Sequence, residues 1–526
     1  MKLASRLRLL IMIAVLALSV AIVAAQDEAV LVIGHAESTD SLDPARGFTQ
    51  TTGIINRVAY DTLVTFPDED ASEILPWLAT DWTISEDGTE YTFTLRDDVT
   101  FVSGNPLTAE DVVFSIQRLQ SVQGNPAFLA DNIESVAANE DGTVTFTLAT
   151  ARPAFLAELT NYAFSVTDSA TIMENGGTDA DDAAETDGAE MYLNGTSAGT
   201  GPYILESWEP QVETVLVKNP NYWGEEPYYD RVIITNIAEA ATQKVALEAG
   251  DIDLALDLTR DQVATLEGNE NLTVYSGPSV YTHFLLMNQD EEYGGPVSDP
   301  TVQLAIRYAL DYDGYKVLWG GVTPPTNLTV GLVAAYGEDK AFTRDLDRAR
   351  ELLAEAGYAD GFDITLSYPD FTWQGVNMNT NAQKIQSDLA EVGINVSLNP
   401  GELQVSLEEY RTGIQGFGYW FWGPDILDPI DVISFLPGGK VGAERANWLS
   451  ENVSDDVNAL IAEASSEVDQ EARIELFAQL QDYLQESGPF APFINPAVQA
   501  AYRSDLQGFV YHPQWTLDVA VLSLPE

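Results

Sequence analysis

The chain has 526 residues, of which 45% are hydrophobic and 20% charged, and it contains no cysteine. This composition supports a folded protein of two or more lobes, because single hydrophobic cores stop growing near roughly 250 to 300 residues. Its 82 acidic and 24 basic residues leave a formal charge of −58, which disfavours nucleic acid and anionic lipid surfaces as partners. The lack of cysteine excludes disulfides, thiolate metal sites and cysteine nucleophiles.

Residues 1–25 have the pattern of an export signal. Three basic residues within positions 1–8 precede an apolar run over 9–25, which ends in the small residues Ala24 and Ala25. We therefore predict a cleaved signal peptide, with an uncleaved membrane anchor as the alternative. Either way the rest of the chain is expected outside the cytoplasm, in a periplasm, on the cell surface or secreted. It is not expected to be a lipoprotein, because no cysteine is present for lipid attachment.

The next patterned segments predict a small sheet. EYTFTL at 90–95 and GTVTFTL at 142–148 alternate apolar and polar residues, as half-buried strands do. Each strand follows an Asp-Gly pair, at 87–88 and 141–142, which is a turn signal. We expect two hairpins that share one sheet.

Helices follow in alternation with strands, which indicates an α/β fold. Thr108 and Asp111 form a capping-box pattern before a helix with apolar residues at helical spacing. Similar spacing predicts four more helices, which begin at Asp299-Pro300, span 344–356, include 382–389 and include 474–484.

Motifs for catalysis or cofactor binding are not evident. The three histidines, His35, His283 and His512, are too scattered to suggest a zinc site or a triad. Gly199-Thr-Gly201 is followed by a proline and a strand-like segment, so it does not fit a phosphate loop. The acidic stretch 174–190 fails the spacing of a calcium loop and is predicted to be a solvated loop. We expect no cofactor and no metal.

A longer block identifies a family resemblance. Residues 76–119, PWLATDWTISEDGTEYTFTLRDDVTFVSGNPLTAEDVVFSIQRL, resemble the extracytoplasmic solute-binding proteins of family 5, the dipeptide, oligopeptide and nickel receptors of ABC importers. Further similar blocks follow in order over most of the chain, at 199–224, 246–254, 299–310, 346–361 and 486–496.

The resemblance implies a two-lobed α/β fold of the periplasmic-binding-protein type II class, with a ligand held between the lobes. Lobe I would comprise 26–285 and 497–526, with an extra subdomain at about 72–195. Lobe II would span 286–496. Hinge strands are expected near 282–288 and 496–502.

One segment resembles the family's pocket motif. In YWFWGPDILDPID, residues 419–431, the motif corresponds to Trp422, Asp425 and Asp428-Pro429. The resemblance assigns Asp425 to the α-ammonium of a bound peptide, and the alternative is that Asp425 caps a turn beside Pro424. Tyr419, Trp420 and Trp422 are expected in the cleft walls, although an extended strand would turn about half of its side chains away.

The segment that corresponds to the carboxylate-binding arginine of dipeptide receptors, residues 367–383, contains no basic residue. Arg445 is the nearest candidate replacement, and a surface ion pair is the alternative for this residue.

Short-peptide binding for delivery to an ABC permease is thus the leading hypothesis, with a monomeric, non-enzymatic receptor. The alternative is an oligosaccharide receptor in which Trp373, Trp420 and Trp422 stack on sugar rings. A nickel complex is less favoured because histidine is scarce. A secreted glycoside hydrolase would need a carboxylate pair that the sequence does not single out.

Overall fold

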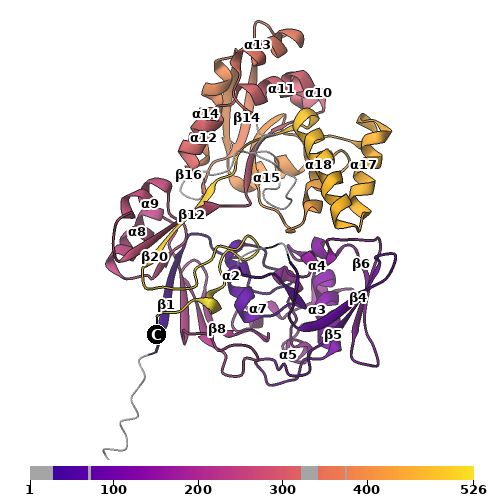
Figure 1. Ribbon diagram of the computed structural model, residues 1–526, viewed down its shortest axis with the longest axis vertical. Coiled ribbons are helices and arrows are strands. Elements are labelled where there is room, and N and C mark those ends of the chain that lie inside the picture. The colour runs from indigo at the N-terminus through magenta and orange to yellow at the C-terminus, as the bar shows by residue number, and fades with distance from the viewer. Residues whose placement is uncertain (1–27, 69–70, 72, 321–341, 374–375, 526) are drawn as a thin grey trace, which may run out of the picture.

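The computed structural model describes residues 28–68, 71, 73–320, 342–373 and 376–525. The predicted signal peptide therefore lies outside the described residues. Figure 1 shows two bodies, one above the other, with strands β12 (Leu272–Pro278) and β20 (Ala497–Arg503) near their junction.

The lower body in Figure 1 is organised around a seven-stranded sheet of order β12-β20-β11-β1-β10-β9-β8. Its other strands are β1 (Val30–His35), β8 (Tyr203–Glu209), β9 (Glu213–Lys218), β10 (Arg231–Asn236) and β11 (Leu254–Ala255). β1 lies parallel to both β10 and β11. Helix α2 (Gln50–Ala59) buries Ile54, Ile55 and Val58 in the same hydrophobic cluster as the apolar residues of β1. Helices α8 (Ala240–Ala249) and α9 (Arg260–Leu266) complete this part.

The predicted small sheet is confirmed. Strands β4 (Ala79–Ile84), β5 (Glu90–Leu95), β6 (Ile133–Ala138) and β7 (Val144–Leu148) form a four-stranded sheet of order β4-β5-β7-β6. Both turn glycines, Gly88 and Gly142, have positive φ angles of 69° and 82°, as the Asp-Gly signals predicted. Helix α3 (Ala109–Val122) begins with the predicted capping box of Thr108 and Asp111.

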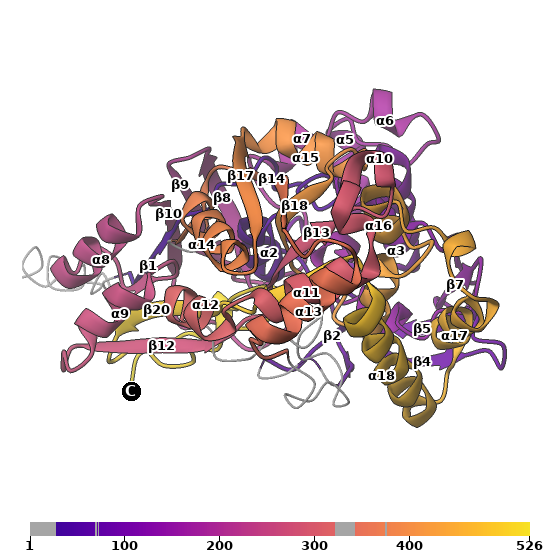
Figure 2. The same ribbon diagram turned by 90° about the horizontal axis from the view of Figure 1, so that it is seen from above.

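The upper body contains a five-stranded sheet of order β17-β14-β18-β13-β19. Its strands are β13 (Thr282–Met287), β14 (Phe362–Pro369), β17 (Ile394–Gly401), β18 (Phe417–Trp422) and β19 (Phe490–Ile494). The helices predicted here are α11 (Pro300–Ala309), α13 (Leu346–Glu355), α14 (Met378–Ala390) and α18 (Gln470–Ser487). Asp299 caps α11 as predicted, and Figure 2 shows α11 beside α13.

Shorter elements connect these parts. They are β2 (Val64–Thr65), β3 (Leu75–Pro76), β15 (Thr372–Trp373), β16 (Val376–Asn377), α4 (Phe155–Glu158), η2 (Tyr162–Phe164), α5 (Ser169–Glu174), α6 (Ala183–Thr186), α7 (Glu190–Leu193), α10 (Glu291–Gly294), α12 (Tyr312–Trp319), α15 (Leu403–Arg411), η5 (Pro429–Phe435), α16 (Lys440–Ala446) and α17 (Asp455–Ser466). In the part of the chain that the structure describes, no helix has both the length and the apolar character needed to cross a membrane.

The chain passes between the two large sheets twice. The first connection, residues 279–281, joins β12 to β13, and the second, residues 495–496, joins β19 to β20. The connections are bonded to each other: the Ser279 hydroxyl donates to the Pro496 carbonyl at 2.6 Å, and the Asn495 side-chain amide donates to the Thr282 hydroxyl at 2.8 Å. Residues 282–287, expected near a hinge, form a strand of the five-stranded sheet.

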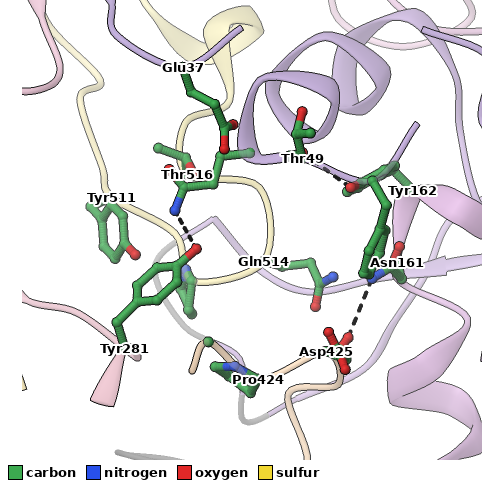
Figure 3. Close-up of a pocket in the computed structure, with 14 residues that line it drawn as sticks. Glu37, Thr49, Asn161, Tyr162, Tyr281, Pro424, Asp425, Tyr511, Gln514 and Thr516 are labelled. Atoms are coloured by element: carbon green, nitrogen blue, oxygen red, sulfur yellow. Dashed lines mark hydrogen bonds between the residues drawn. The ribbon is translucent and has the colours of Figure 1, made fainter. Parts of the chain in front are cut away.

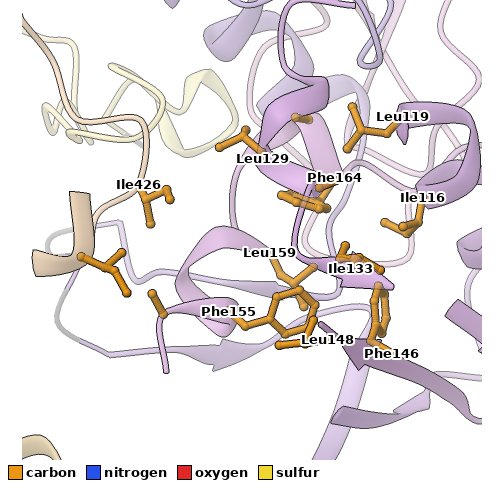
Figure 4. Close-up of a cluster of buried hydrophobic side chains, with 14 of the residues drawn as sticks. Ile116, Leu119, Leu129, Ile133, Phe146, Leu148, Phe155, Leu159, Phe164 and Ile426 are labelled. Carbon is orange, nitrogen blue, oxygen red and sulfur yellow. The ribbon is translucent and has the colours of Figure 1, made fainter. Parts of the chain in front are cut away.

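The two bodies also touch away from these connections. Ile426, from the loop after β18, belongs to the same buried cluster as Leu129, Leu159 and Phe164 of the lower body, as Figure 4 shows. The Lys440 ammonium of α16 lies 5.6 Å from the ring centroid of Phe128. Because apolar side chains of both bodies share one cluster, the structure is a closed arrangement.

The acidic stretch 174–190 is mostly exposed, but the prediction of a solvated loop is wrong in two respects. Ala183–Thr186 form helix α6, with Ala183 and Ala189 buried, and Asp187 is not solvated. The Asp187 side chain is fully buried and pairs with Arg118 at 2.8 Å. Arg118 is also bidentate to Asp43, with distances of 2.6 and 2.7 Å. A guanidinium removed from water requires such charged partners, and this requirement brings one acid of the stretch inside.

Candidate functional site

A cavity of about 210 Å³ lies where the two bodies and the first connection meet. Figure 3 shows it surrounded by five segments: the loop after β1 with the start of α2, the start of η2, the first connection, the loop after β18 and the C-terminal segment. The lining residues are Glu37, Phe48, Thr49, Gln50, Asn161, Tyr162, Tyr281, Gly423, Pro424, Asp425, Tyr511, Pro513, Gln514 and Thr516. This location fits a small-molecule site, which commonly lies at a domain interface.

The loop after β18 brings Asp425 into the cavity. It passes close to Tyr281 at Gly423, where an added Cβ would lie 2.4 Å from the tyrosine ring, so a side chain there would clash. The Asp425 amide donates to the Asp431 carboxylate at 3.2 Å, and the Asp425 carbonyl accepts from the Asn161 side-chain amide at 3.4 Å. Hydrogen bonds between the Asp425 main chain and the side chains of Asp431 and Asn161 therefore hold the loop in place.

The two neighbouring acids of this loop have different environments. Asp431 is buried and accepts from the Trp422 indole at 3.0 Å and from the Asp425 amide. The Asp425 carboxylate, by contrast, accepts no hydrogen bond from any residue that the structure describes. Asp431 thus holds the turn, and the Asp425 carboxylate is available to a ligand.

Burial also controls the protonation of this pair. It raises the pKa of Asp425 to about 6, although the positive charges of Arg445 and Lys440 favour the ionised form. Burial and the nearby charge of Asp425 raise the pKa of Asp431 well above its ordinary value. Asp425 is therefore the acid of the pair that ionises first as pH rises.

Glu37 enters the cavity from the carboxyl end of β1. His35, the last residue of β1, pairs with Asp257 at 2.7 Å, and the Ala36 amide donates to the same carboxylate at 2.7 Å. The Thr51 amide in the first turn of α2 donates to Glu37 Oε2 at 2.9 Å. Glu37 is an exposed residue that lines the cavity. Desolvation by the surrounding chain raises the pKa of its carboxyl group, although the charge of His35 and the hydrogen bonds from Thr51 favour the ionised form.

Aromatic side chains supply much of the remaining wall. The Tyr162 hydroxyl donates to the Thr49 carbonyl at 3.1 Å, and the Gln50 side-chain amide donates to the Tyr281 hydroxyl (Figure 3). Burial raises the pKa of Tyr162 and of Tyr281, and the negative charges of Glu37 and Asp425 raise both further. Each phenol thus stays neutral near pH 7 and lies within electrostatic reach of both carboxylates.

The aromatic residues predicted in the cleft walls occupy other places. Tyr419 is fully buried, and its hydroxyl bonds the His283 imidazole at 2.8 Å. Trp420 is buried on the opposite face of β18, where its ring stacks on Tyr410 with centroids 4.3 Å apart. Trp422 packs beside Trp420 on that face and donates to Asp431. None of the three is among the residues that line the cavity.

Trp373 and Arg445 also lie outside the cavity lining. The Trp373 ring packs edge-to-face against Tyr281, which lines the cavity, with ring centroids 4.8 Å apart. The Arg445 guanidinium lies 4.7 Å from the Tyr410 ring and 5.5 Å from the Trp422 ring. From this position outside the lining, the positive charge of Arg445 lowers the pKa of Asp425 and so opposes the effect of burial.

Most of the cavity was not anticipated from the motif at 419–431. Glu37, Tyr162, Tyr281, Tyr511 and Gln514 come from four distant segments. A signal existed for Glu37, because it follows a buried strand and ligands often bind at the carboxyl ends of parallel strands. No local pattern marks the others. Within the described residues, no group of three or more histidine, aspartate or glutamate side chains is arranged to hold a metal ion.

Comparisons with known proteins agree with this geometry. Residues 73–442 match the family model described as bacterial extracellular solute-binding proteins, family 5 middle. The chain is 28% identical to the probable D,D-dipeptide-binding periplasmic protein DdpA of Escherichia coli, over 93% of each chain. It is 27% identical to the di/tripeptide-binding protein 2 of Pseudomonas aeruginosa, over 92% of this chain and 93% of that protein.

Solved structures are similar over nearly the whole chain. The periplasmic binding protein DppA of Helicobacter pylori, in complex with the peptide STSA, has 26% identity and a TM-score of 0.76, over 95% of this chain and 99% of that one. HbpA2 of Haemophilus parasuis has 25% identity and a TM-score of 0.78, over 94% of this chain and 100% of that one. These similarities agree with the predicted two-lobed fold, in which the two large sheets belong to opposite lobes.

Proposed function

Because the chain belongs to the bacterial extracellular solute-binding proteins of family 5, we propose that it captures short peptides in the interlobe cavity. It then delivers them to the permease of an ABC importer. The names of two relatives, a dipeptide-binding and a di/tripeptide-binding protein, support this ligand class. The protein acts by binding and release, as a monomer and without catalysis.

The observation that carries the proposal is the unpartnered carboxylate of Asp425. It faces a cavity between the two bodies, and no described residue donates a hydrogen bond to it. An α-ammonium group would form charge-assisted hydrogen bonds with this carboxylate. A ligand without such a donor would leave the acid desolvated and unpaired, which costs free energy. Asp425 therefore selects ligands with a free amino terminus.

We also propose how the chain is exported and which segments form its two lobes. Residues 1–25 direct export and are removed, and the mature chain remains soluble outside the cytoplasm without a lipid anchor. The boundary at 285 that the resemblance implied would split β13 (Thr282–Met287) between the lobes. We therefore place lobe I at 26–278 and 497–526 and lobe II at 282–494, and the two connections at 279–281 and 495–496 permit opening. The tryptophans that the oligosaccharide hypothesis requires do not line the cavity, and this disfavours a sugar ligand.

Thermal denaturation with matched ligands tests the proposal. Free-amino dipeptides should raise the melting temperature, while their N-acetylated forms should not, because ligand binding to the folded state stabilises it by mass action. Asp425→Asn should abolish the difference, whereas Asp97→Asn, at an exposed acid of the small subdomain, should leave it intact. Equal shifts with acetylated peptides would refute the role of Asp425. Absence of any shift across a dipeptide library would refute peptide capture.

A further inference from the structure

The charged side chains that line the cavity are all acidic among the described residues. Glu37 and Asp425 contribute carboxylates to its lining, and no lysine or arginine does so among the described residues. Figure 3 shows the two acids on opposite sides of the space, with Gln514 between them in the view. The nearest cations to Asp425, Arg445 and Lys440, act on it from α16 without lining the cavity.

The neutral part of the wall also suits a cation. Tyr162, Tyr281 and Tyr511 line the space together with Phe48, and the faces of aromatic rings attract ammonium and guanidinium groups. The amides of Asn161 and Gln514 and the hydroxyls of Thr49 and Thr516 can bond polar main-chain groups of a ligand. A ligand carboxylate, in contrast, meets no positive partner in the described wall.

Glu37 has the geometry of a second anchor. Its Oε2 atom accepts from the Thr51 amide and hydroxyl, at 2.9 and 3.3 Å. In the described part of the chain, no group donates to Oε1. Glu37 therefore has one oxygen fixed at the start of α2 and one oxygen available to the cleft. Two carboxylates on opposite sides of a small space favour a ligand with a positive charge at each end.

We propose that this cavity selects short peptides with two positive charges, whose α-ammonium binds Asp425 and whose lysine or arginine side chain reaches Glu37. This inference rests on the proposed function and adds the charge of the ligand. It predicts that basic dipeptides bind better than neutral ones, and that acidic dipeptides bind worst.

Isothermal titration calorimetry with two dipeptides of matched shape tests the inference. Alanyl-lysine and alanyl-norleucine differ at the second side chain mainly by the ammonium group. Wild type should bind alanyl-lysine about tenfold to a hundredfold more tightly, as expected for one additional charge-assisted hydrogen bond. Glu37→Gln retains an acceptor for the Thr51 amide, and it should reduce the preference to about twofold or less. Glu134→Gln, at an exposed glutamate of β6, should retain the full preference.

The outcomes separate this inference from the proposed function. Binding of both dipeptides with equal affinity by wild type would overturn the charge inference and leave peptide capture intact. A preference for lysine that survives in Glu37→Gln would overturn the role of Glu37. If no dipeptide binds but 1,5-diaminopentane does, and either Glu37→Gln or Asp425→Asn abolishes that binding, the cavity prefers a ligand with two positive charges, but the ligand is not a peptide and the proposed function fails. The wild-type comparison remains decisive even if Glu37→Gln does not fold.

Discussion

The ionisation of Asp425 predicts a specific pH dependence of ligand binding. Burial raises the pKa of this acid to about 6 in the empty cavity. A bound α-ammonium requires the carboxylate form, so protonation of Asp425 competes with the ligand. Affinity should therefore be highest between about pH 7 and 8 and should fall as the pH decreases through 6.

The size of the change in affinity with pH follows from the pKa of Asp425. An acid with a pKa of about 6 is roughly one-tenth ionised at pH 5 and nine-tenths ionised at pH 7. Binding at pH 5 should then be about tenfold weaker than at pH 7, and at pH 6 about half a proton should be released per ligand bound. Above pH 8 the affinity should fall again, because a peptide α-amino group loses its proton near pH 8.

Calorimetry of alanyl-norleucine between pH 5 and 9 measures this profile, since the α-ammonium is the only cation of this ligand. Titrations in two buffers of different ionisation enthalpy count the protons released. Asp425→Asn should abolish proton release at pH 6, whereas Asp97→Asn should reproduce the wild-type profile. A dissociation constant that does not change between pH 5 and 7, or unchanged proton release in Asp425→Asn, would show that the ionised Asp425 carboxylate does not bind the α-ammonium.

Three stability predictions follow from buried groups, each measured by urea denaturation. Arg118→Met should destabilise the fold by up to about 3–5 kcal/mol, because it leaves the buried Asp43 and Asp187 carboxylates with the partly exposed Arg46 as their remaining cation. Arg350→Met, at a half-exposed arginine, should cost less than about 1 kcal/mol, and equal losses would contradict a special role of the buried ion pairs. Gly199→Ala should cost about 1–3 kcal/mol because its Cβ would lie 2.2 Å from the Ala59 carbonyl oxygen, whereas Gly188→Ala, with no atom closer than 3.5 Å, should be nearly neutral. Burial lowers the pKa of His283 to about 3, so the neutral imidazole should not reduce the free energy of unfolding above pH 6.5, and this free energy should fall as the pH decreases towards 3, by roughly 2 kcal/mol at pH 5. His283→Gln should remove this part of the acid sensitivity. An unchanged dependence of the free energy of unfolding on pH in this variant would show that other groups cause it.

The local elements of this protein follow from short stretches of its amino-acid sequence. The two Asp-Gly turns, the strands after them and the capping box at Thr108 depend on neighbouring residues, and each lies where the pattern predicted. Such patterns encode backbone conformation and the periodicity of burial, both of which act over a few residues. The family resemblance likewise followed from contiguous blocks of residues, and the family model confirms it.

Tertiary structure decided which side chains share the cavity. The motif at 419–431 contains several aromatic residues and acids, but β18 directs Tyr419 and Trp420 into packed interiors. Of this motif, the loop after the strand reaches the cavity. There Asp431 holds the turn, while the Asp425 carboxylate accepts no hydrogen bond from the residues that the structure describes. Glu37, Tyr281 and Tyr511 join Asp425 from positions more than eighty residues away in sequence, and local patterns carry no information about such contacts. Their meeting depends on how the two sheets are connected and closed, because packing across the lobes, rather than local conformation, brings distant groups within reach of one ligand.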